Sequence, residues 1–352
     1  MGSGTTILAA KEKGIPAVGY DISPLSVLAT KTKISYLHYD SLYSHWLFLK
    51  KNLTPPLETD FQKEAYPDLV QEALPGKFLT WLDWIKSNIR QRIFDPAEKD
   101  FFLLGLLAVL PMFSRAVATG GWLKWRDEVL TEKDLKTAFE EKIASMLHDL
   151  KESSLNGKNS EQWIAKCADA RSLPNESPTF SAVITSPPYP NRHDYTRVFG
   201  VELMFAFLDK DKTRELRYQS IESHPEARPK RKNSIGYRSP QALESAIQQI
   251  TLSVKDKRIL RMLRGYFLDM YLCLQEMKRV CIPGARIAMI VGNAQYCGIP
   301  ILVDEYVADA GEQVGLICEK IMIARYRGNS AQQMKIFGRN PSQESVVMFR
   351  CP

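Results

Sequence analysis

Val183-Ile184-Thr185-Ser186-Pro187-Pro188-Tyr189 is an apolar strand that ends in a stiff turn, and no other stretch of this sequence is as informative. Its two prolines have fixed φ angles and no backbone N–H, so the turn is rigid and its carbonyls stay free as acceptors. Ser186 offers a second acceptor, and Tyr189 places an aromatic ring beside both. Two rigid acceptors under a flat ring suit the exocyclic amino group of a flipped nucleobase. The alternative interpretation is a strand that simply ends in a proline turn.

A glycine turn opens the chain and leads into a predicted helix. Met1-Gly2-Ser3-Gly4-Thr5-Thr6 is followed by apolar residues in helical spacing over 7–10. Glycines let the backbone approach a ligand closely, and the free N–H groups of a helix N-terminus face it. Ala17-Val18-Gly19-Tyr20-Asp21 then reads as a short strand that ends in an acid. In nucleotide-binding α/β folds, a carboxylate about 20 residues after the glycines accepts hydrogen bonds from the ribose.

A second acid, Asp169, stands shortly before the strand that ends at Thr185. In this order, the four pieces resemble the S-adenosylmethionine-dependent DNA amino-methyltransferases, which modify cytosine N4 or adenine N6. The glycine turn looks like the end of the family motif Asp-Pro-Phe-x-Gly-Ser-Gly-Thr-Thr. Ser186-Pro187-Pro188-Tyr189 looks like the catalytic motif in the serine form that is typical of cytosine-N4 members. The resemblance covers the first 35 residues and most of 165–352.

This resemblance implies S-adenosyl-L-methionine as cofactor and double-stranded DNA with one flipped base as substrate. The residues that it assigns to the cofactor are Gly2, Ser3, Gly4, Thr5, Asp21 and Asp169. Of these, Asp169 is expected to bind the adenine amino group, and the others the methionine and ribose parts. The residues that it assigns to catalysis are Ser186, Pro187, Pro188 and Tyr189. No metal is expected, and cysteine-based C5 methylation is excluded because no cysteine follows a proline.

One departure from the family pattern concerns the start of the chain. The family motif follows a buried strand and an Asp-Pro-Phe, whereas this chain begins at the Met directly before the glycines. We therefore expect that the chain is truncated, that the first strand of the sheet is missing and that the upstream reading frame encodes it. An inactive remnant is accordingly one of the alternative functions.

The bulk composition is that of an ordinary globular protein. The 352 residues are 45% hydrophobic and 25% charged, and the net charge of +7 is compatible with a nucleic-acid partner. The six scattered cysteines form no Cys-x-x-Cys pair, which favours a reducing cytoplasm over a zinc site or a disulfide framework. The longest apolar run, 101–113, is too short to span a bilayer and predicts a buried helix, so no membrane partner is expected.

The chain pattern predicts an α/β fold, a Rossmann-like doubly wound sheet of the class I methyltransferase type. Residues 1–35 and 161–352 form the predicted catalytic domain, and 36–160 form a mainly helical insertion that could recognise the target sequence. Within the catalytic domain, 209–258 reads as a basic loop insertion without periodicity. A helix is expected over 259–280. The last two strands, 315–325 and 345–350, are expected to pair antiparallel at the sheet edge.

Basic side chains in two loops are candidate DNA contacts. Arg192 and Arg197 follow the catalytic motif, and Arg228, Lys230, Arg231 and Lys232 form a run that a proline keeps out of helix. Solvated charges with internal Asp–Arg pairing are the alternative for both loops. The stretch 122–126 interleaves aromatic and basic residues, as a DNA contact would. Packing of its tryptophans in the core of the insertion explains the pattern at least as well.

These observations together predict a site-specific DNA methyltransferase that acts on cytosine N4 in a restriction–modification system. A cognate restriction endonuclease would act on the same DNA site without binding this chain. Ser186 alone supports cytosine, because adenine-N6 enzymes usually carry Asp or Asn there. Adenine-N6 methylation and methylation of RNA or of a protein amide are the other enzymatic alternatives.

Overall fold

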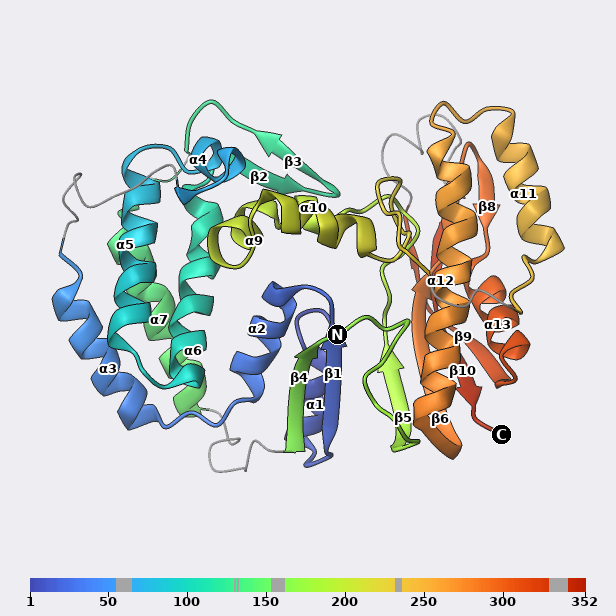
Figure 1. The fold of residues 1–352 in the computed structure, drawn as a ribbon, viewed down its shortest axis with the longest axis horizontal. Coiled ribbons are helices and arrows are strands. Elements are labelled where there is room, and N and C mark those ends of the chain that lie inside the picture. The colour runs from blue at the N-terminus through green and yellow to red at the C-terminus, as the bar shows by residue number, and fades with distance from the viewer. Residues whose placement is uncertain (55–64, 130, 132, 153–161, 232–235, 329–340) are drawn as a thin grey trace. The chain divides into compact units, whose positions relative to one another are not determined.

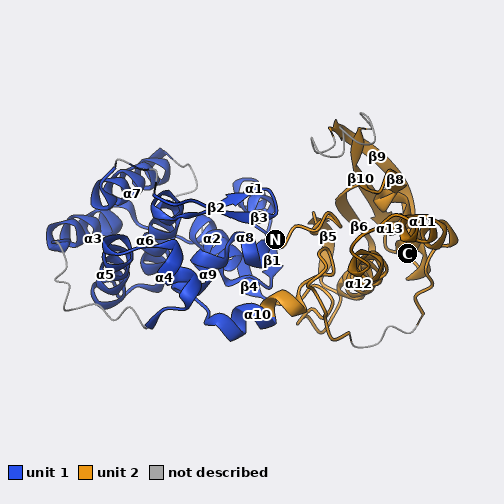
Figure 2. Ribbon diagram, turned by 90° about the horizontal axis from the view of Figure 1, so that it is seen from above, with its two compact units in different colours: residues 1–167, 195–215 blue, residues 168–194, 216–352 orange. Residues whose placement is uncertain are grey.

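The computed structural model describes residues 1–352 except 55–64, 130, 132, 153–161, 232–235 and 329–340. The chain divides into two compact units (Figure 2). The first comprises Met1–Cys167 and Tyr195–Glu215, and the second comprises Ala168–Asp194 and Leu216–Pro352. The first unit thus contains both residues 1–35 and the described part of 36–160. The division into catalytic domain and insertion stays a prediction.

The first unit begins with the turn, helix, strand and helix that the sequence predicts (Figure 1). These elements are α1 (Thr5–Glu12), β1 (Ala17–Asp21) and α2 (Pro24–Ile34). β1 pairs in parallel with β4 (Trp163–Cys167), and Gly19 stands opposite Ala165. Ile7, Ile34 and Trp163 form a small buried cluster with these strands, so the helices pack on the sheet through their apolar positions.

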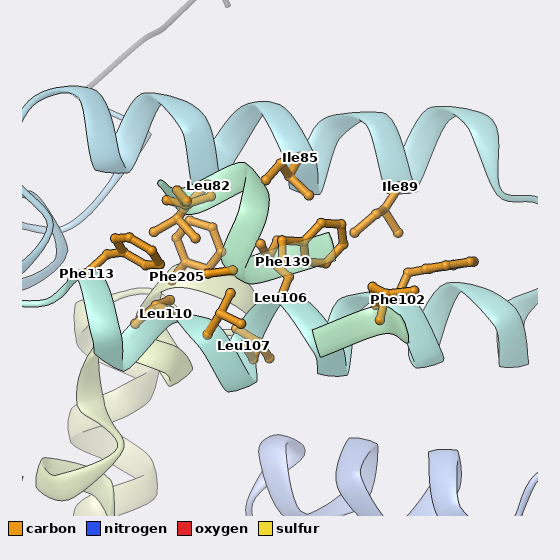
Figure 3. Close-up of a cluster of buried hydrophobic side chains, with 14 of the residues drawn as sticks. Leu82, Ile85, Ile89, Phe102, Leu106, Leu107, Leu110, Phe113, Phe139 and Phe205 are labelled. Carbon is orange, nitrogen blue, oxygen red and sulfur yellow. The ribbon is translucent and has the colours of Figure 1, made fainter. Parts of the chain in front are cut away.

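Helices make up most of the remainder of the first unit, as predicted. They are α3 (Tyr39–Asn52), α4 (Asp68–Ala73), α5 (Lys77–Arg92), α6 (Pro96–Val109), the 3-10 helix η3 (Leu110–Phe113), α7 (Leu135–Glu152), α8 (Tyr195–Val198) and α9 (Gly200–Ala206). The side chain of Asp95 caps α6 by accepting from the amides of Ala97 and Glu98 at 2.9 Å. Their shared core draws on α5, α6, α7 and α9 (Figure 3). Its labelled members are Leu82, Ile85, Ile89, Phe102, Leu106, Leu107, Leu110, Phe113, Phe139 and Phe205.

Residues 116–125 form a short hairpin, which corrects the prediction that the tryptophans of 122–126 pack in the core of the insertion. β2 (Ala116–Thr119) and β3 (Trp122–Trp125) pair antiparallel around the turn Gly120-Gly121. Trp122 and Trp125 are 57% and 43% exposed, so neither is a core residue. The alternation of a strand turns Leu123 toward the helical core and Trp122 away from it, whereas Trp125 lies on the same side as Leu123 and is nevertheless 43% exposed.

The second unit is built on a four-stranded sheet in the order β5-β6-β10-β9. Its strands are β5 (Phe180–Thr185), β6 (Cys281–Gly292), β9 (Ile317–Arg327) and β10 (Ser342–Arg350). β5 runs parallel to β6, whereas β10 is antiparallel to both β6 and β9. The expected antiparallel strand pair at the C-terminal end is therefore confirmed. A separate two-stranded sheet joins β7 (Ala294–Tyr296) and β8 (Ile299–Ile301).

Three helices pack in this unit, α11 (Gln241–Thr251), α12 (Arg258–Val280) and α13 (Val303–Gln313). Of these, α12 and α13 contact the four-stranded sheet, and α11 contacts α12 and β8. α12, expected over 259–280, buries fourteen of its residues, among them Tyr266, Phe267 and Met270. No helix in the described ranges is long and apolar enough to cross a membrane.

The interpretation of 209–258 as an aperiodic loop is wrong. The segment contains α10 (Lys210–Gln219) and α11. In α11 the buried residues are Leu243, Ala246, Ile247 and Ile250, which follow the i, i+3, i+4, i+7 spacing of an amphipathic helix. The sequence pattern did not predict this helix because its apolar stripe is short and is surrounded by polar and charged residues.

The strands predicted to form one doubly wound sheet belong to two sheets in the described part of the chain. Among the described residues, β1 pairs only with β4, and β5 only with β6. The structure is thus a mixed α/β fold with several small sheets, and one continuous sheet is not formed by the described strands.

Candidate active site

The glycine turn and Asp21 lie together in the first unit, as the sequence predicts. The Gly2 amide donates to Asp21 Oδ2 at 2.8 Å, and the Ser23 amide donates to Oδ1 at 2.9 Å. Lys33 Nζ donates to the Ser3 carbonyl at 2.7 Å from α2. The carboxylate at the end of β1 therefore shapes the turn and stands beside it.

Gly4 needs to be glycine for two reasons. Its φ is +83°, in the left-handed region, and an added Cβ would lie 2.5 Å from Thr30 Oγ1. Gly4 is also the N-cap of α1, where no side chain accepts from the first amides of the helix. The N-terminus of α1 therefore retains donors for a ligand.

Asp169 is held in the second unit by the arginine two residues later. Arg171 donates from its amide and from Nε to Asp169 Oδ1 at 2.9 and 3.0 Å, and from Nη2 to Oδ2 at 2.7 Å. Arg171 also pairs at 3.0 Å with Asp269, which is fully buried. The Asp169 side chain keeps 38% exposure, so it is oriented and still open to a ligand.

The Ser-Pro-Pro-Tyr turn follows β5 directly, as expected. Ser186 is exposed, and within the described residues the Pro187 carbonyl accepts no hydrogen bond. Ser186 Oγ lies 3.5 Å from the hydroxyl of Tyr189. The turn is anchored just beyond Tyr189, where the Tyr296 hydroxyl donates to the Pro190 carbonyl at 2.6 Å.

The Tyr189 hydroxyl has a charged partner that the sequence did not reveal. It donates to Glu344 Oε1 at 2.5 Å. In the sheet, Glu344 on β10 stands opposite Gly292 on β6 and opposite Arg325 on β9. The strand register thus brings a carboxylate, flanked by an arginine, to the tyrosine of the turn.

Two arginines of β9 complete this arrangement. Arg325 donates through Nε to Glu344 Oε2, and Arg327 Nη2 lies 3.2 Å from Oε1. The Arg327 guanidinium also lies over the Tyr189 ring, 5.7 Å from its centroid. Tyr189, Glu344, Arg325 and Arg327 therefore form one hydrogen-bonded and charged cluster, which we name the tyrosine cluster.

Gly292 at the end of β6 leaves room for the ring. A Cβ at Gly292 would lie 2.8 Å from Tyr189 Cε2, closer than non-bonded carbons approach. Gly292 therefore leaves the space in which the Tyr189 ring is placed. In the sequence, only its position at the end of a strand indicates this role.

The surroundings within the tyrosine cluster raise the pKa of Tyr189 and lower that of Glu344. Burial and the hydrogen bond to Glu344 raise the pKa of Tyr189. Burial opposes the charge of Glu344, but the hydrogen bonds from Arg325 and Tyr189 outweigh it and lower the pKa of that carboxyl. The pair is therefore a neutral phenol that donates to an ionised carboxylate.

The candidate DNA contacts fall into different environments. Arg192 is exposed, with a φ of +70° and its amide bound to the Ser223 carbonyl at 3.0 Å. Arg228 and Lys230 are also exposed. Arg231 instead pairs with Glu222 at 2.5 Å and with buried Asp269 at 2.9 Å, so its guanidinium has a structural role. Lys232 lies outside the described residues.

Arg197 belongs to the first unit, whereas the other described candidates belong to the second. It belongs to α8, and its guanidinium lies over the ring of Trp122, 5.3 Å from the centroid. Asp194, which was expected to orient the arginines of this loop, is buried and pairs with Arg217 at 3.0 Å.

The residue placements can be compared with known proteins. No protein-family model matches the chain. The chain is 29% identical to the type II methyltransferase M.BsoBI of Geobacillus stearothermophilus, over all of this chain and 79% of that protein. It is 25% identical to the type II methyltransferases M.AvaI of Nostoc sp. and of Anabaena variabilis, with the same coverage. The chain is therefore a distant homologue, along its whole length, of type II DNA methyltransferases.

Proposed function

We propose that this chain transfers a methyl group from S-adenosyl-L-methionine to the exocyclic N4 of cytosine in double-stranded DNA. The observation that carries the proposal is the end of β5, where Ser186 is exposed and the Pro187 carbonyl accepts no bond from the described residues. The Tyr189 ring stands beside them. The type II methyltransferases at 25–29% identity support DNA as the substrate and restriction–modification as the context.

The residues assigned to the cofactor have the properties that the role requires. A Cβ at Gly2 would meet no atom within 4 Å, so that side of the turn is open. The first amides of α1 have no side-chain cap, and Asp21 stands next to the turn as an acceptor. We assign the methionine and ribose parts to Gly2–Thr5 and Asp21, and the adenine amino group to Asp169. The bound cofactor would supply an electrophilic methyl group on a sulfonium.

The protein groups would act on the nucleophile. The cytosine amino nitrogen is a poor nucleophile because its lone pair is delocalised into the ring. Hydrogen bonds from its two hydrogens to Ser186 Oγ and to the Pro187 carbonyl favour a more tetrahedral nitrogen with an available lone pair. Rate acceleration then comes from positioning and from preset acceptors. Serine cannot keep the released proton, which passes to solvent.

Tyr189 would stack on the flipped base. Stacking of a base on an aromatic side chain contributes about 1–3 kcal/mol. Glu344 restricts the rotation of the ring through the hydroxyl, so the stacking surface is set before the base arrives. Arg192, Arg228 and Lys230 are proposed phosphate contacts, since they are exposed cations of the same unit.

The product identifies the reaction. Duplex DNA is incubated with the chain and the methyl donor, digested to nucleosides and analysed by mass spectrometry. N4-methylcytosine supports the proposal, and N6-methyladenine would overturn the choice of base. Methyl groups found only on RNA or protein would exclude DNA as the substrate, and the absence of any methyl transfer would overturn the proposed activity.

Two substitutions test the assigned residues in the same assay. Ser186→Ala is expected to lower turnover by about 10- to 1000-fold, the scale of removing one preset polar contact at a reacting centre. Activity should persist, because the Pro187 carbonyl still accepts one hydrogen. Tyr189→Ala is expected to remove most turnover and to leave cofactor affinity unchanged. Full turnover by both variants would place the catalytic centre elsewhere.

A further inference from the structure

The β2–β3 hairpin exposes an aromatic and basic surface that the proposed reaction does not use. Its strands are joined by the turn Gly120-Gly121, and their register pairs Thr119 with Trp122 and Val117 with Lys124. Directly opposite residues of an antiparallel pair share a face. One face therefore carries Trp122 and Lys124, and the other carries Leu123 and its partner Ala118.

Packing shows which face points outward. Leu123 contacts the helical core of the first unit, and Ala116 on the same face is 5% exposed. On the other face, Trp122 is 57% exposed, and Lys124 is exposed as well. The hairpin is thus fixed to its unit on one side and presents Trp122 and Lys124 on the other.

The outward face is strongly cationic. Beyond the paired residues, the Arg126 amide donates to the Arg115 carbonyl at 2.9 Å, so these arginines continue the same row. The segment 115–126 contains three cations and no acid, and the exposed acids Asp127 and Glu128 follow it. Arg197 of α8 adds a fourth, with its guanidinium over the Trp122 ring at 5.3 Å. We name Arg115, Trp122, Lys124, Arg126 and Arg197 the hairpin surface.

We propose that the hairpin surface is a DNA-contacting element, in which the cations bind backbone phosphates and Trp122 packs on sugar or base. This inference rests on the proposed function, since it takes DNA as the substrate. The exposed Trp122 ring stands among several cations of one strand face, and such a row of cations suits a polyanion. A two-stranded ribbon also has the width that the major groove admits. A second copy of the chain is a poorer partner, because its identical surface would bring like charges together.

The test compares DNA binding by the full chain and three variants. The charge variant is Lys124→Ala/Arg126→Ala, and the aromatic variant is Trp122→Ala. Lys51→Ala/Lys142→Ala on α3 and α7 is the matched control, because it removes the same charge from the same unit. Binding of a labelled duplex is measured by fluorescence anisotropy at several salt concentrations. Thermal unfolding verifies that each variant is folded, as we expect because none of the altered side chains is buried.

The two hairpin variants should differ in their salt dependence. Each phosphate contact contributes about −0.9 to the slope of log affinity against log salt, so the charge variant should flatten this slope by about two units. The aromatic variant should weaken binding roughly 5- to 100-fold at every salt concentration, the scale of one lost stacking contact, without changing the slope. The control should match the wild type.

The outcomes separate this inference from the proposed function. If the wild type binds and methylates DNA but both hairpin variants behave as the control, the hairpin inference is wrong and the proposed function stands. If the wild type neither binds nor methylates DNA, the proposed function is wrong, and the hairpin inference is overturned with it. Should the aromatic variant not fold, the charge variant decides by itself.

Discussion

Glu344 orients the hydroxyl of Tyr189, and this hydrogen bond connects the sheet to the Ser-Pro-Pro-Tyr turn. The Tyr189 hydroxyl donates to it at 2.5 Å, while Arg325 and Arg327 keep the carboxylate charged. A charge-assisted hydrogen bond of this kind is stronger than a neutral one. The ring that is proposed to receive the base is therefore positioned by a residue from another strand.

Replacing Glu344 with Gln should lower the turnover number about 10- to 100-fold, because the ring loses its charged anchor. The Michaelis constant for the methyl donor should not change. Tyr189→Phe should lower the turnover number by a similar factor. The double variant Tyr189→Phe/Glu344→Gln should be no slower than Tyr189→Phe, since the hydrogen bond between the two side chains is already absent. Steady-state kinetics of the single and double variants measure this coupling.

Glu319→Gln is the control for Glu344, because Glu319 also pairs with two arginines, Arg286 and Arg350, on the same sheet. It should retain wild-type turnover. Additive losses in the double variant would show that Glu344 acts on the sheet in general and not on Tyr189.

Asp169 offers a second test at the scale of one residue. Asp169→Ala should weaken binding of S-adenosyl-L-methionine by about 1–3 kcal/mol, the cost of removing a hydrogen-bonding partner of the adenine amino group. Isothermal titration calorimetry measures this, and DNA binding should survive.

The control for Asp169 is Asp256→Ala. Asp256 is clasped by Arg258 in the same way, with the amide, Nε and Nη2 at 3.0, 2.9 and 2.8 Å. If both substitutions leave cofactor affinity unchanged, Asp169 is a turn residue and the adenine pocket lies elsewhere.

At the scale of elements, α5 carries a buried lysine beside the stacked rings of Tyr66 and Phe205. Lys86 is 6% exposed, and its Nζ lies 4.4 Å from the centroid of the Tyr66 ring and 4.3 Å from that of Phe205. It donates to the Phe205 carbonyl at 3.0 Å, which ties α5 to α9. Burial lowers the pKa of Lys86 to about 8, against the opposing charge of Asp83.

This lowered pKa predicts a pH dependence of stability. Between pH 8 and the ordinary lysine value of 10.5, the unfolded chain binds more protons at Lys86 than the folded chain does. The contribution of Lys86 to the free energy of unfolding therefore rises with pH in that window, by about 1.4 kcal/mol per pH unit. Urea unfolding of the wild type and of Lys86→Met is measured at pH values through this window. The free energy of unfolding of the wild type should increase with pH relative to that of the variant.

The exposed Lys51 provides the control for this prediction. Lys51→Met makes the same exchange at an exposed side chain, and its unfolding is measured in parallel to isolate the part of the Lys86 effect that depends on burial. A difference between wild type and Lys86→Met that stays constant with pH would mean that Lys86 titrates as an ordinary surface lysine.

At the scale of the whole molecule, the net charge of +7 supports association with a polyanion. Affinity for a duplex without the target site should fall as a power of the salt concentration, about tenfold or more for a fourfold rise in salt if two or more phosphates are contacted. Anisotropy titrations in sodium chloride measure this fall. An affinity that does not change with salt would argue against DNA as the partner.

The sequence alone determined the elements whose causes are local. The glycine turn before α1, the acid that ends β1, the prolines that end β5 and the long apolar face of α12 each depend on residues close in the chain. Such patterns follow from backbone geometry and side-chain periodicity, and they placed the proposed catalytic and cofactor residues on turns at strand and helix ends. α11 was missed only because its apolar stripe is short.

Tertiary structure decided what depends on residues far apart in the chain. Tyr189 and Glu344 are separated by 155 positions, and only the register of β6, β10 and β9 brings the carboxylate and Gly292 to the ring. The same holds for Arg231, whose sequence neighbours suggest a solvent-exposed loop but whose partners are Glu222 and Asp269. The exposure of Trp122 followed from which face of its hairpin the helical core covers. Burial and pairing are properties of the packed chain, and no local pattern contains them.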